Sequence, residues 1–358
     1  MNHSPLPASN YIDPGAFEID KYKIFYRSWQ CVGHVSELAT AGAYLTFKVV
    51  EEDIVVIRGH DDRIRAFFNV CRHRGHPVAE GRGRRSSLVC GYHGWTYDLD
   101  GRFRAAPQAS AEDLKSCEGL RLREIQLEIF LGFIFINLDD AQPPLEPTLD
   151  GIKEEFESFH PNPQALRFVC ETSIEHESNW KVSVENYNEC YHCPNVHATS
   201  LVKGVLALEG YSIAVKGPAI WHLGKAQDQN EKQYEYDPSH GRRGGDYGSF
   251  FIWPNTSLAC YPGGFVSIRQ WLALSYRKTV YRYRWFSDGT LTDSEVEKVM
   301  RTHRATTGAE DAVVVAKVQN GMESQAFEPG PYIIGDGVGA MSEVALRHLH
   351  DLYRRAVS

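Results

Sequence analysis

The sequence has no long apolar run. Its most apolar stretch, residues 129–138, is ten residues long and contains Gly132. A helix needs roughly 20 apolar residues to cross a bilayer, so this stretch is too short and predicts buried β structure. The first Lys or Arg is Lys21, and no apolar segment follows the N-terminus, so the sequence shows no secretory signal. We therefore expect a cytoplasmic protein that does not act on a membrane.

An excess of positive charge is also missing. The chain has 46 acidic and 38 basic residues and a formal net charge of −8. This balance argues against nucleic acid or an anionic membrane surface as the main partner. The 42% of hydrophobic residues is typical of a globular protein with a sizeable core, and 358 residues favour about two domains.

A complete nucleotide-binding motif is missing as well. The glycine-rich run at 335–339 lacks the preceding strand and the full spacing of a phosphate-binding loop. Because nothing indicates export, the eight cysteines are expected to be thiols or metal ligands rather than disulfides. Cys190 and Cys193 resemble a redox pair by spacing, but simple packing is the expected role for both.

The pattern of apolar residues changes along the chain. Short β-prone runs separated by charged turns extend from Tyr44 to Leu138, which is typical of an antiparallel β domain. A proline-rich connector follows near residues 143–147, and mixed helices and strands follow it. The main helices are expected at residues 151–159, 179–192, 292–318 and 341–356, and strands at 249–259 and 265–286.

Two Cys–His pairs form the strongest chemical signal. Cys71 precedes His73 by two positions, and Cys90 precedes His93 by three. Such a mixed set can place two thiolates on one iron and two imidazoles on the other iron of a [2Fe–2S] cluster. A structural zinc site can use the same four ligands, but a zinc finger usually has both cysteines in one half of the motif. A zinc-stabilised binding protein and a pure electron carrier therefore stay as alternatives.

A second group contains histidines and carboxylates. Residues 179–192 are expected to form one helix with Glu189 and His192 on the same face, and Pro194 is expected to interrupt it and turn His197 back. Two histidines and one carboxylate bind Fe(II) in non-haem oxygenases and leave open positions. The candidates for the carboxylate are Glu310, Asp311, Glu323 and Asp336.

Both groups resemble the motifs of one family, the Rieske non-haem iron oxygenases. The run from Cys71 to Trp95 is similar to the cluster motif, and the run from Trp180 to His197 is similar to the catalytic-iron motif. The resemblance covers about residues 20 to 350 and implies an α+β fold with one [2Fe–2S] cluster and one Fe(2+). It implies an N-terminal segment packed on the catalytic domain, a β-rich Rieske domain, and a catalytic domain with a curved antiparallel sheet, at residues 1–40, 41–158 and 159–358.

The resemblance also assigns individual residues. It favours Asp311 over Glu310 as the third iron ligand. It gives Glu189 a catalytic role as a bridge between His192 and the cluster histidine His93 of an adjacent chain. Most members have aspartate at this position. The glutamate variant resembles the branch that oxidises carnitine, choline, glycine betaine and proline betaine.

The implied activity is that of a terminal monooxygenase component. It would use O2 to hydroxylate or N-demethylate a small quaternary ammonium substrate. A separate flavin and iron–sulfur reductase would supply electrons from NAD(P)H, and the chain is expected to form a homotrimer. Hydroxylation or dihydroxylation of an aromatic carboxylate is the alternative reaction.

The substrate pocket is expected to be aromatic, because aromatic faces attract quaternary ammonium groups. Arg269 has two interpretations, a partner for a substrate carboxylate or a surface or structural residue, and the second is the simpler. The arginines at 82, 84 and 85 would dock an acidic electron donor or lie in a solvated loop. The residues expected to contact the substrate are Trp221, Phe251, Trp253 and Tyr261.

Overall fold

The computed structural model describes residues 4–227, 233–239 and 242–358. They divide into two compact units. One unit contains residues 26–143, and the other contains the chain up to Phe25 and from Pro144 onward. Within the described residues, every helix is too short or too polar to cross a membrane. The first three residues of the expected segment 1–40 lie outside the described residues.

The unit of residues 26–143 contains a seven-stranded antiparallel sheet in the order β1-β10-β9-β4-β3-β2-β5 and a three-stranded sheet, β6-β7-β8. Residues 54–57 in the middle of β3 are fully buried, so both faces of this strand are covered. Their β-branched side chains suit a strand. The elements are β1 (Gln30–His34), η2 (Val35–Leu38), β2 (Ala43–Val49), β3 (Glu52–Arg58), β4 (Ile64–Phe68), β5 (Arg82–Arg84), β6 (Leu88–Val89), β7 (Thr96–Tyr97), β8 (Phe103–Ala105), α3 (Ala111–Ser116), β9 (Glu124–Phe130) and β10 (Phe133–Asn137).

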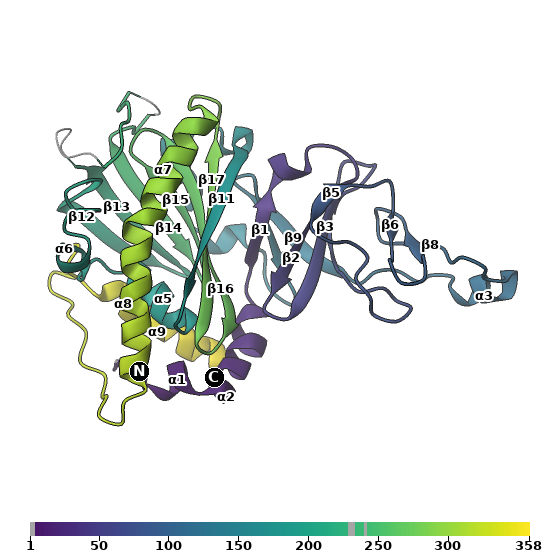
Figure 1. The fold of residues 1–358 in the computed structure, drawn as a ribbon, viewed down its shortest axis with the longest axis horizontal. Helices are drawn as coiled ribbons and strands as arrows, with labels where there is room; N and C mark the ends of the chain where they lie inside the picture. Colours follow the sequence, from purple (N-terminus) through teal and green to yellow (C-terminus); the bar gives the residue numbers. More distant parts are fainter. Residues whose placement is uncertain (1–3, 228–232, 240–241) are drawn as a thin grey trace. The chain divides into compact units, whose positions relative to one another are not determined.

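The second unit is built on a long antiparallel sheet in the order β11-β17-β16-β15-β14-β13-β12. Helices α7 and α8 pack on β11, and α5 contacts β16 and α8 (Figure 1). The strands are β11 (Arg167–His176), β12 (Leu206–Lys216), β13 (Ala219–Ala226), β14 (Asp246–Ile252), β15 (Thr256–Tyr261), β16 (Phe265–Ser275) and β17 (Lys278–Ser287). The helices are α1 (Ser9–Ile12), α2 (Pro14–Asp20), η1 (Lys21–Phe25), η3 (Glu146–Thr148), α4 (Ile152–Phe159), η4 (Pro163–Ala165), α5 (Trp180–Tyr187), α6 (Cys193–Val196), α7 (Asp293–Ala305), α8 (Thr307–Met322) and α9 (Val344–Val357).

The boundaries of the units differ from those expected from the sequence. Residues 26–40 belong with the first unit, because β1 forms an antiparallel ladder with β10 in which Gln30 pairs with Ile136. Helix α4 belongs with the second unit, because Phe156 packs against Phe250 with ring centroids 6.1 Å apart. Hydrogen bonds and aromatic packing, rather than the proline-rich connector alone, therefore set these limits.

Two helix predictions were wrong in extent. The helix expected at 292–318 is two helices, because the chain turns sharply at Thr306, where φ is −112° and ψ is −100°. The helix expected at 179–192 ends at Tyr187. Asn188 caps it, since its side-chain Nδ2 donates to the carbonyl of Val184 at 2.8 Å.

Candidate active site

Two loops with the same local design carry the Cys–His pairs. The amide of Gly75 donates to the carbonyl of Cys71, and the amide of Gly94 donates to the carbonyl of Cys90, each at 3.0 Å. Both glycines have positive φ, +80° and +71°. A residue with a side chain rarely adopts this conformation, so glycine allows both tight turns.

The four candidate cluster ligands differ in burial. The thiols of Cys71 and Cys90 belong to the buried core of their unit, whereas His73 and His93 are exposed. The two imidazole rings lie close together, with centroids 4.7 Å apart, and Trp95 stacks on His73 at 4.6 Å. Two buried thiols and two exposed imidazoles are a donor set that would hold a [2Fe–2S] cluster.

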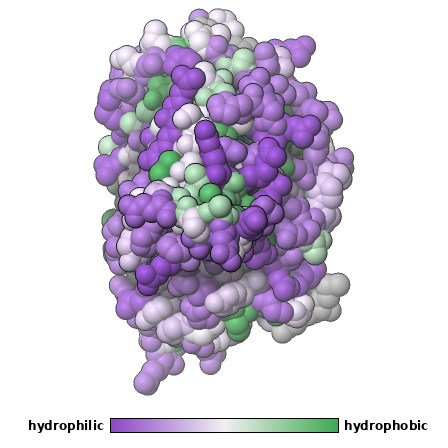
Figure 2. All heavy atoms as spheres, turned by 90° about the vertical axis from the view of Figure 1, so that its right-hand side faces the viewer, coloured by the Kyte–Doolittle hydropathy of each residue, from purple (hydrophilic) through white to green (hydrophobic). Residues whose placement is uncertain are grey.

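The unit of residues 26–143 has a mainly hydrophilic surface at the end that carries β6, β8 and α3. Figure 2 looks onto the end that carries β6, β8 and α3, and shows a small apolar group amid polar atoms. Of the three arginines that would dock a donor or lie in a solvated loop, Arg82 pairs with Glu37 at 2.9 Å, and Arg84 and Arg85 donate to backbone carbonyls. All three are exposed, so these contacts do not prevent binding of an acidic partner.

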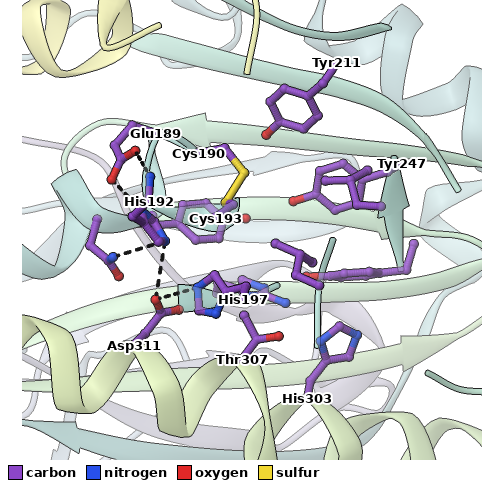
Figure 3. Close-up of a pocket in the computed structure, with 16 residues that line it drawn as sticks. Glu189, Cys190, His192, Cys193, His197, Tyr211, Tyr247, His303, Thr307 and Asp311 are labelled. Atoms are coloured by element: carbon purple, nitrogen blue, oxygen red, sulfur yellow. Dashed lines mark hydrogen bonds and ion pairs between the residues drawn. A yellow bond between two sulfur atoms is a disulfide. The ribbon is translucent and has the colours of Figure 1, made fainter. Parts of the chain in front are cut away.

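In the second unit, three side chains converge on one point. Oδ1 of Asp311 lies 3.0 Å from Nε2 of His197 and 3.7 Å from Nε2 of His192. One potential ligand atom from each residue lies within 4.8 Å of the other two (Figure 3). This set of two imidazoles and one carboxylate fits a non-haem iron ion with open positions.

A second carboxylate contacts the Nδ1 atom of each histidine. Nδ1 of His197 lies 2.7 Å from Glu310, and Nδ1 of His192 lies 2.5 Å from Glu189. These contacts leave both Nε2 atoms turned toward Asp311, the arrangement usual for metal-binding histidines. Burial lowers the pKa of His197, but Asp311 and Glu310 outweigh burial and raise it overall.

The local chain path differs from the expected continuous helix. His192 and His197 flank the short helix α6, and Pro194 lies in its first turn, where proline starts a helix rather than interrupting one. Glu189 holds the preceding turn, since its Oε2 accepts the amide of His192 at 3.2 Å. The closeness of Glu189 and His192 therefore comes from a turn and not from a shared helix face.

Close packing brings Asp311 to this point from a distant part of the sequence. Helix α8 approaches the sheet at Gly308, where a Cβ atom would lie 2.6 Å from the hydroxyl of Tyr283. Farther along α8, Oε1 of Gln319 accepts the amide of Asn179 at 2.8 Å, which ties α8 to the start of α5. The two contacts set the position of α8 against the elements that carry the histidines.

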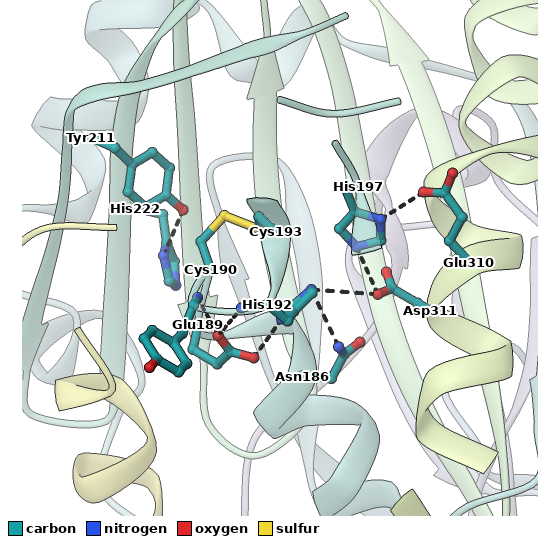
Figure 4. The surroundings of a disulfide bond; sticks show 11 residues. Asn186, Glu189, Cys190, His192, Cys193, His197, Tyr211, His222, Glu310 and Asp311 are labelled. Carbon is teal, nitrogen blue, oxygen red and sulfur yellow. Dashed lines mark hydrogen bonds and ion pairs between the residues drawn. A yellow bond between two sulfur atoms is a disulfide. The ribbon is translucent and has the colours of Figure 1, made fainter. Parts of the chain in front are cut away.

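The expectation that all eight cysteines are free or metal-bound was wrong. Cys190 and Cys193 form a disulfide that bridges the turn containing His192 (Figure 4). Both residues are buried and line the same pocket as the histidines. The disulfide ties the start of α6 to the residue after Glu189.

A pocket of about 60 Å³ adjoins the three converging side chains (Figure 3). Tyr261 lines it, as expected. Trp221, Phe251 and Trp253 do not, because each packs against another aromatic ring, with centroids 5.7 to 5.9 Å apart. The other pocket tyrosines are Tyr187, Tyr211 and Tyr247.

The remaining carboxylate candidates lie elsewhere. Glu323 pairs with Arg277 at 3.0 Å, and Asp336 accepts the amides of Val338 and Gly339 in a loop. Glu310 contacts the outer nitrogen of His197, so within this group Asp311 faces both imidazoles.

Several pocket residues could not be found from local patterns. Nδ2 of Asn186 lies 3.4 Å from Nε2 of His192, and His303 and Thr307 line the pocket from α7 and α8. The sequence indicated Arg269 only weakly as a pocket residue. The signal is that a charged residue lies within the apolar strand β16. The sequence favoured a structural or surface role for it, but it is buried and lines the pocket.

Comparisons with known proteins agree with this geometry. The family description "Rieske [2Fe-2S] domain" matches residues 28–125, and "Ring hydroxylating alpha subunit (catalytic domain)" matches residues 163–358. The chain belongs to the Rieske non-haem iron oxygenases. This confirms the expected α+β fold, the expected [2Fe–2S] cluster and iron as cofactors, and an oxidoreductase activity.

Several similar proteins are named for quaternary ammonium compounds. The carnitine monooxygenase oxygenase subunit of Escherichia coli K12 is 31% identical over 97% of this chain and 92% of its own length. Choline monooxygenase of Arabidopsis thaliana is 28% identical over 98% of this chain and 82% of its own length. The solved quaternary ammonium Rieske monooxygenase CntA with L-carnitine is 28% identical, has a TM-score of 0.85 and covers 99% of this chain and 96% of its own.

Proposed function

We propose that this chain is the oxygenase component of a monooxygenase that hydroxylates a carbon attached to nitrogen in a small quaternary ammonium compound. The observation that carries the proposal is the convergence of His192, His197 and Asp311 beside a small pocket lined by tyrosines. Similar proteins are named for carnitine, glycine betaine and choline, and CntA has been solved with L-carnitine and with gamma-butyrobetaine.

The proposed ligands follow from the donor sets. Two thiols and two imidazoles would hold the cluster, and His192, His197 and Asp311 would hold the iron. An iron ion held there would supply the activation of O2 next to the substrate. Glu189 and Glu310 keep the imidazoles turned inward, and the pocket would hold the substrate. Tyrosine faces contribute up to about 2 kcal/mol to binding of a desolvated quaternary ammonium group. The proposed cluster ligands are Cys71, His73, Cys90 and His93.

The reaction needs electrons from outside the chain. One oxygen atom of O2 enters a C–H bond, and the other leaves as water after uptake of two electrons and two protons. If the carbon is an N-methyl group, the hydroxylated product releases formaldehyde and a tertiary amine. A flavin-containing reductase that oxidises NAD(P)H would supply the electrons to the cluster.

We also propose that electrons cross between subunits of a homotrimer. Glu189 contacts His192 within one chain, and its exposed fraction of 12% leaves it accessible to a neighbour. The bridge would be completed by His93 of the partner subunit, whose counterpart in this chain is exposed. A CntA structure is described in terms of carnitine oxidation and inter-subunit electron transfer, which supports this route.

The test is turnover of defined substrates with a reductase. We expect O2 consumption and release of formaldehyde or an amine with L-carnitine, gamma-butyrobetaine, glycine betaine or choline. His192→Ala should lower turnover at least about 100-fold and remove the iron, but it should keep the visible absorption of the cluster. Cys71→Ser is the matched control, since it should remove that absorption. Normal turnover by His192→Ala would refute the iron site.

A further inference from the structure

Arg269 is a buried cation in the wall of the pocket. It lies on β16, and its exposed fraction is 6%. Its Nη1 donates to the hydroxyl of Tyr281 at 2.9 Å. Its guanidinium carbon lies 5.0 to 5.5 Å from the ring centroids of Tyr187, Tyr261 and Tyr283. The tyrosine rings offset part of the cost of burying the charge but cannot neutralise it.

Among the described residues, no carboxylate lies within ion-pair distance of Arg269, and its buried Nε has no hydrogen-bond partner. Arg284, a buried arginine of the same sheet, has a different environment, since its Nε lies 3.3 Å from Glu171. A buried charge without a counterion is costly, so buried charges are almost always paired. Among the described residues, the charge of Arg269 therefore has no counterion.

Two more polar groups of the pocket are unsatisfied. Nε2 of His303 and Oγ1 of Thr307 are buried and, within the described part of the chain, have no hydrogen-bond partner. Burial lowers the pKa of His303 to about 3, with a further contribution from the charge of Arg269, so the imidazole is neutral. Three residues that line one small cavity, from β16, α7 and α8, thus each carry a buried polar atom without a hydrogen-bond partner among the described residues. This matches a site that holds a polar ligand.

We propose that Arg269, with His303 and Thr307, binds a carboxylate of the substrate, so that the substrate is a zwitterionic betaine rather than a choline-like cation. The inference rests on the proposed function, because it names the residues that bind the carboxylate end of the same substrate. Figure 3 shows His303 on the opposite side of the pocket from Glu189 and His192. The carboxylate would therefore lie on the side of the pocket away from His192, and the nitrogen-bound carbon would lie nearer to His192.

The sign of the charge makes the proposal selective. A guanidinium binds a carboxylate through charge-assisted hydrogen bonds, which are about twice as strong as neutral ones. The same guanidinium repels a trimethylammonium group that has no carboxylate beside it. Glycine betaine and choline share the trimethylammonium group and the chain length, and they differ in carboxylate against hydroxymethyl. They are a matched pair of probes.

The experiment measures Kd without O2 and kcat/KM with reductase for both probes. The wild-type enzyme should prefer glycine betaine at least about 10-fold. Arg269→Gln should weaken the binding of glycine betaine about 10- to 100-fold. The affinity for choline should stay equal or improve, since the repulsion is removed. Arg269→Lys should lie between, because a lysine lacks the planar fork. Thr307→Val keeps the arginine and should weaken glycine betaine more than choline, which provides a second test if Arg269→Gln does not fold.

Arg284→Gln is the control for loss of a buried arginine outside the pocket. It should lower stability and leave the preference between the two probes unchanged. An equal loss of affinity for glycine betaine and choline in Arg269→Gln would overturn the inference. Equal values of kcat/KM for the two probes with the wild-type enzyme would overturn it as well. If neither probe is bound but benzoate is, and Arg269→Gln loses benzoate, the carboxylate site stands and the proposed function fails.

Discussion

Replacing Gly308 with alanine tests whether the close approach of α8 to the sheet positions Asp311. Gly308 precedes Asp311 by three residues on the same helix, so both lie on the face toward the sheet. The added methyl group changes no charge and no hydrogen bond. Any effect on iron content must therefore pass through packing, that is, through the position of α8 or of the side chains that the methyl group would meet.

The structure gives the size of the effect. The new Cβ would lie 2.6 Å from the hydroxyl of Tyr283 and 2.8 Å from Cδ1 of Ile174. Ordinary carbon contacts are about 3.5 to 4.0 Å, so α8 must move by roughly 1 Å. Tyr283 is 2% exposed and cannot turn away into solvent. Overpacking costs about 1 to 3 kcal/mol of unfolding free energy, and a displacement of about 1 Å can lower turnover about 100-fold.

Gly321 provides the matched control, because it is near the end of the same helix and a Cβ atom added there would meet nothing within 4 Å. Gly321→Ala should raise stability by about 0.5 to 1 kcal/mol and leave turnover unchanged. Denaturant unfolding, iron content and O2 consumption are measured for both variants. If Gly308→Ala matches the wild-type protein in all three, the packing of α8 does not position Asp311.

Two further predictions concern His197. Glu310→Ala should weaken binding of Fe(II) about 10- to 100-fold while the cluster absorption stays, because Nδ1 of His197 loses its partner at 2.7 Å; equilibrium dialysis measures this. Burial lowers the pKa of His197, but its carboxylate partners raise it above the ordinary 6.5. In the metal-free protein, protonated His197 therefore stabilises the fold below about pH 6.5, and this contribution is lost as pH rises through the raised pKa. Since Fe(II) needs the neutral imidazole, its affinity should instead rise in titrations as pH increases through this raised pKa.

Both experiments have internal controls. Glu323→Ala removes a carboxylate just beyond α8 that pairs with Arg277, and it should leave Fe(II) affinity unchanged. An equal loss of affinity in the two glutamate variants would contradict a specific role for Glu310. Fe(II) affinity that is flat with pH would contradict the coupling to His197.

Local patterns indicated some features of the candidate site and missed others. The Cys–His pairs were visible because each pair lies within one short loop, and glycines such as Gly75 and Gly94 mark the tight turns. The helix expected at 179–192 failed because Asn188 hydrogen-bonds back to Val184 and ends it, which helical periodicity does not predict. The aromatic pocket residues were mostly wrong because the face on which each strand residue lies depends on the pairing of the strands.

The sequence by itself determined the family, the fold class and the expected cofactors, because the motifs that carry them depend on residue identity at short spacing. Only the tertiary structure decided that Asp311, 114 residues after His197, faces both imidazoles, and its role as a ligand stays a prediction. The tertiary structure also decided that Arg269 is buried beside the pocket without a carboxylate among the described residues. Such contacts join distant elements, and they depend on strand register and helix packing that no local pattern records.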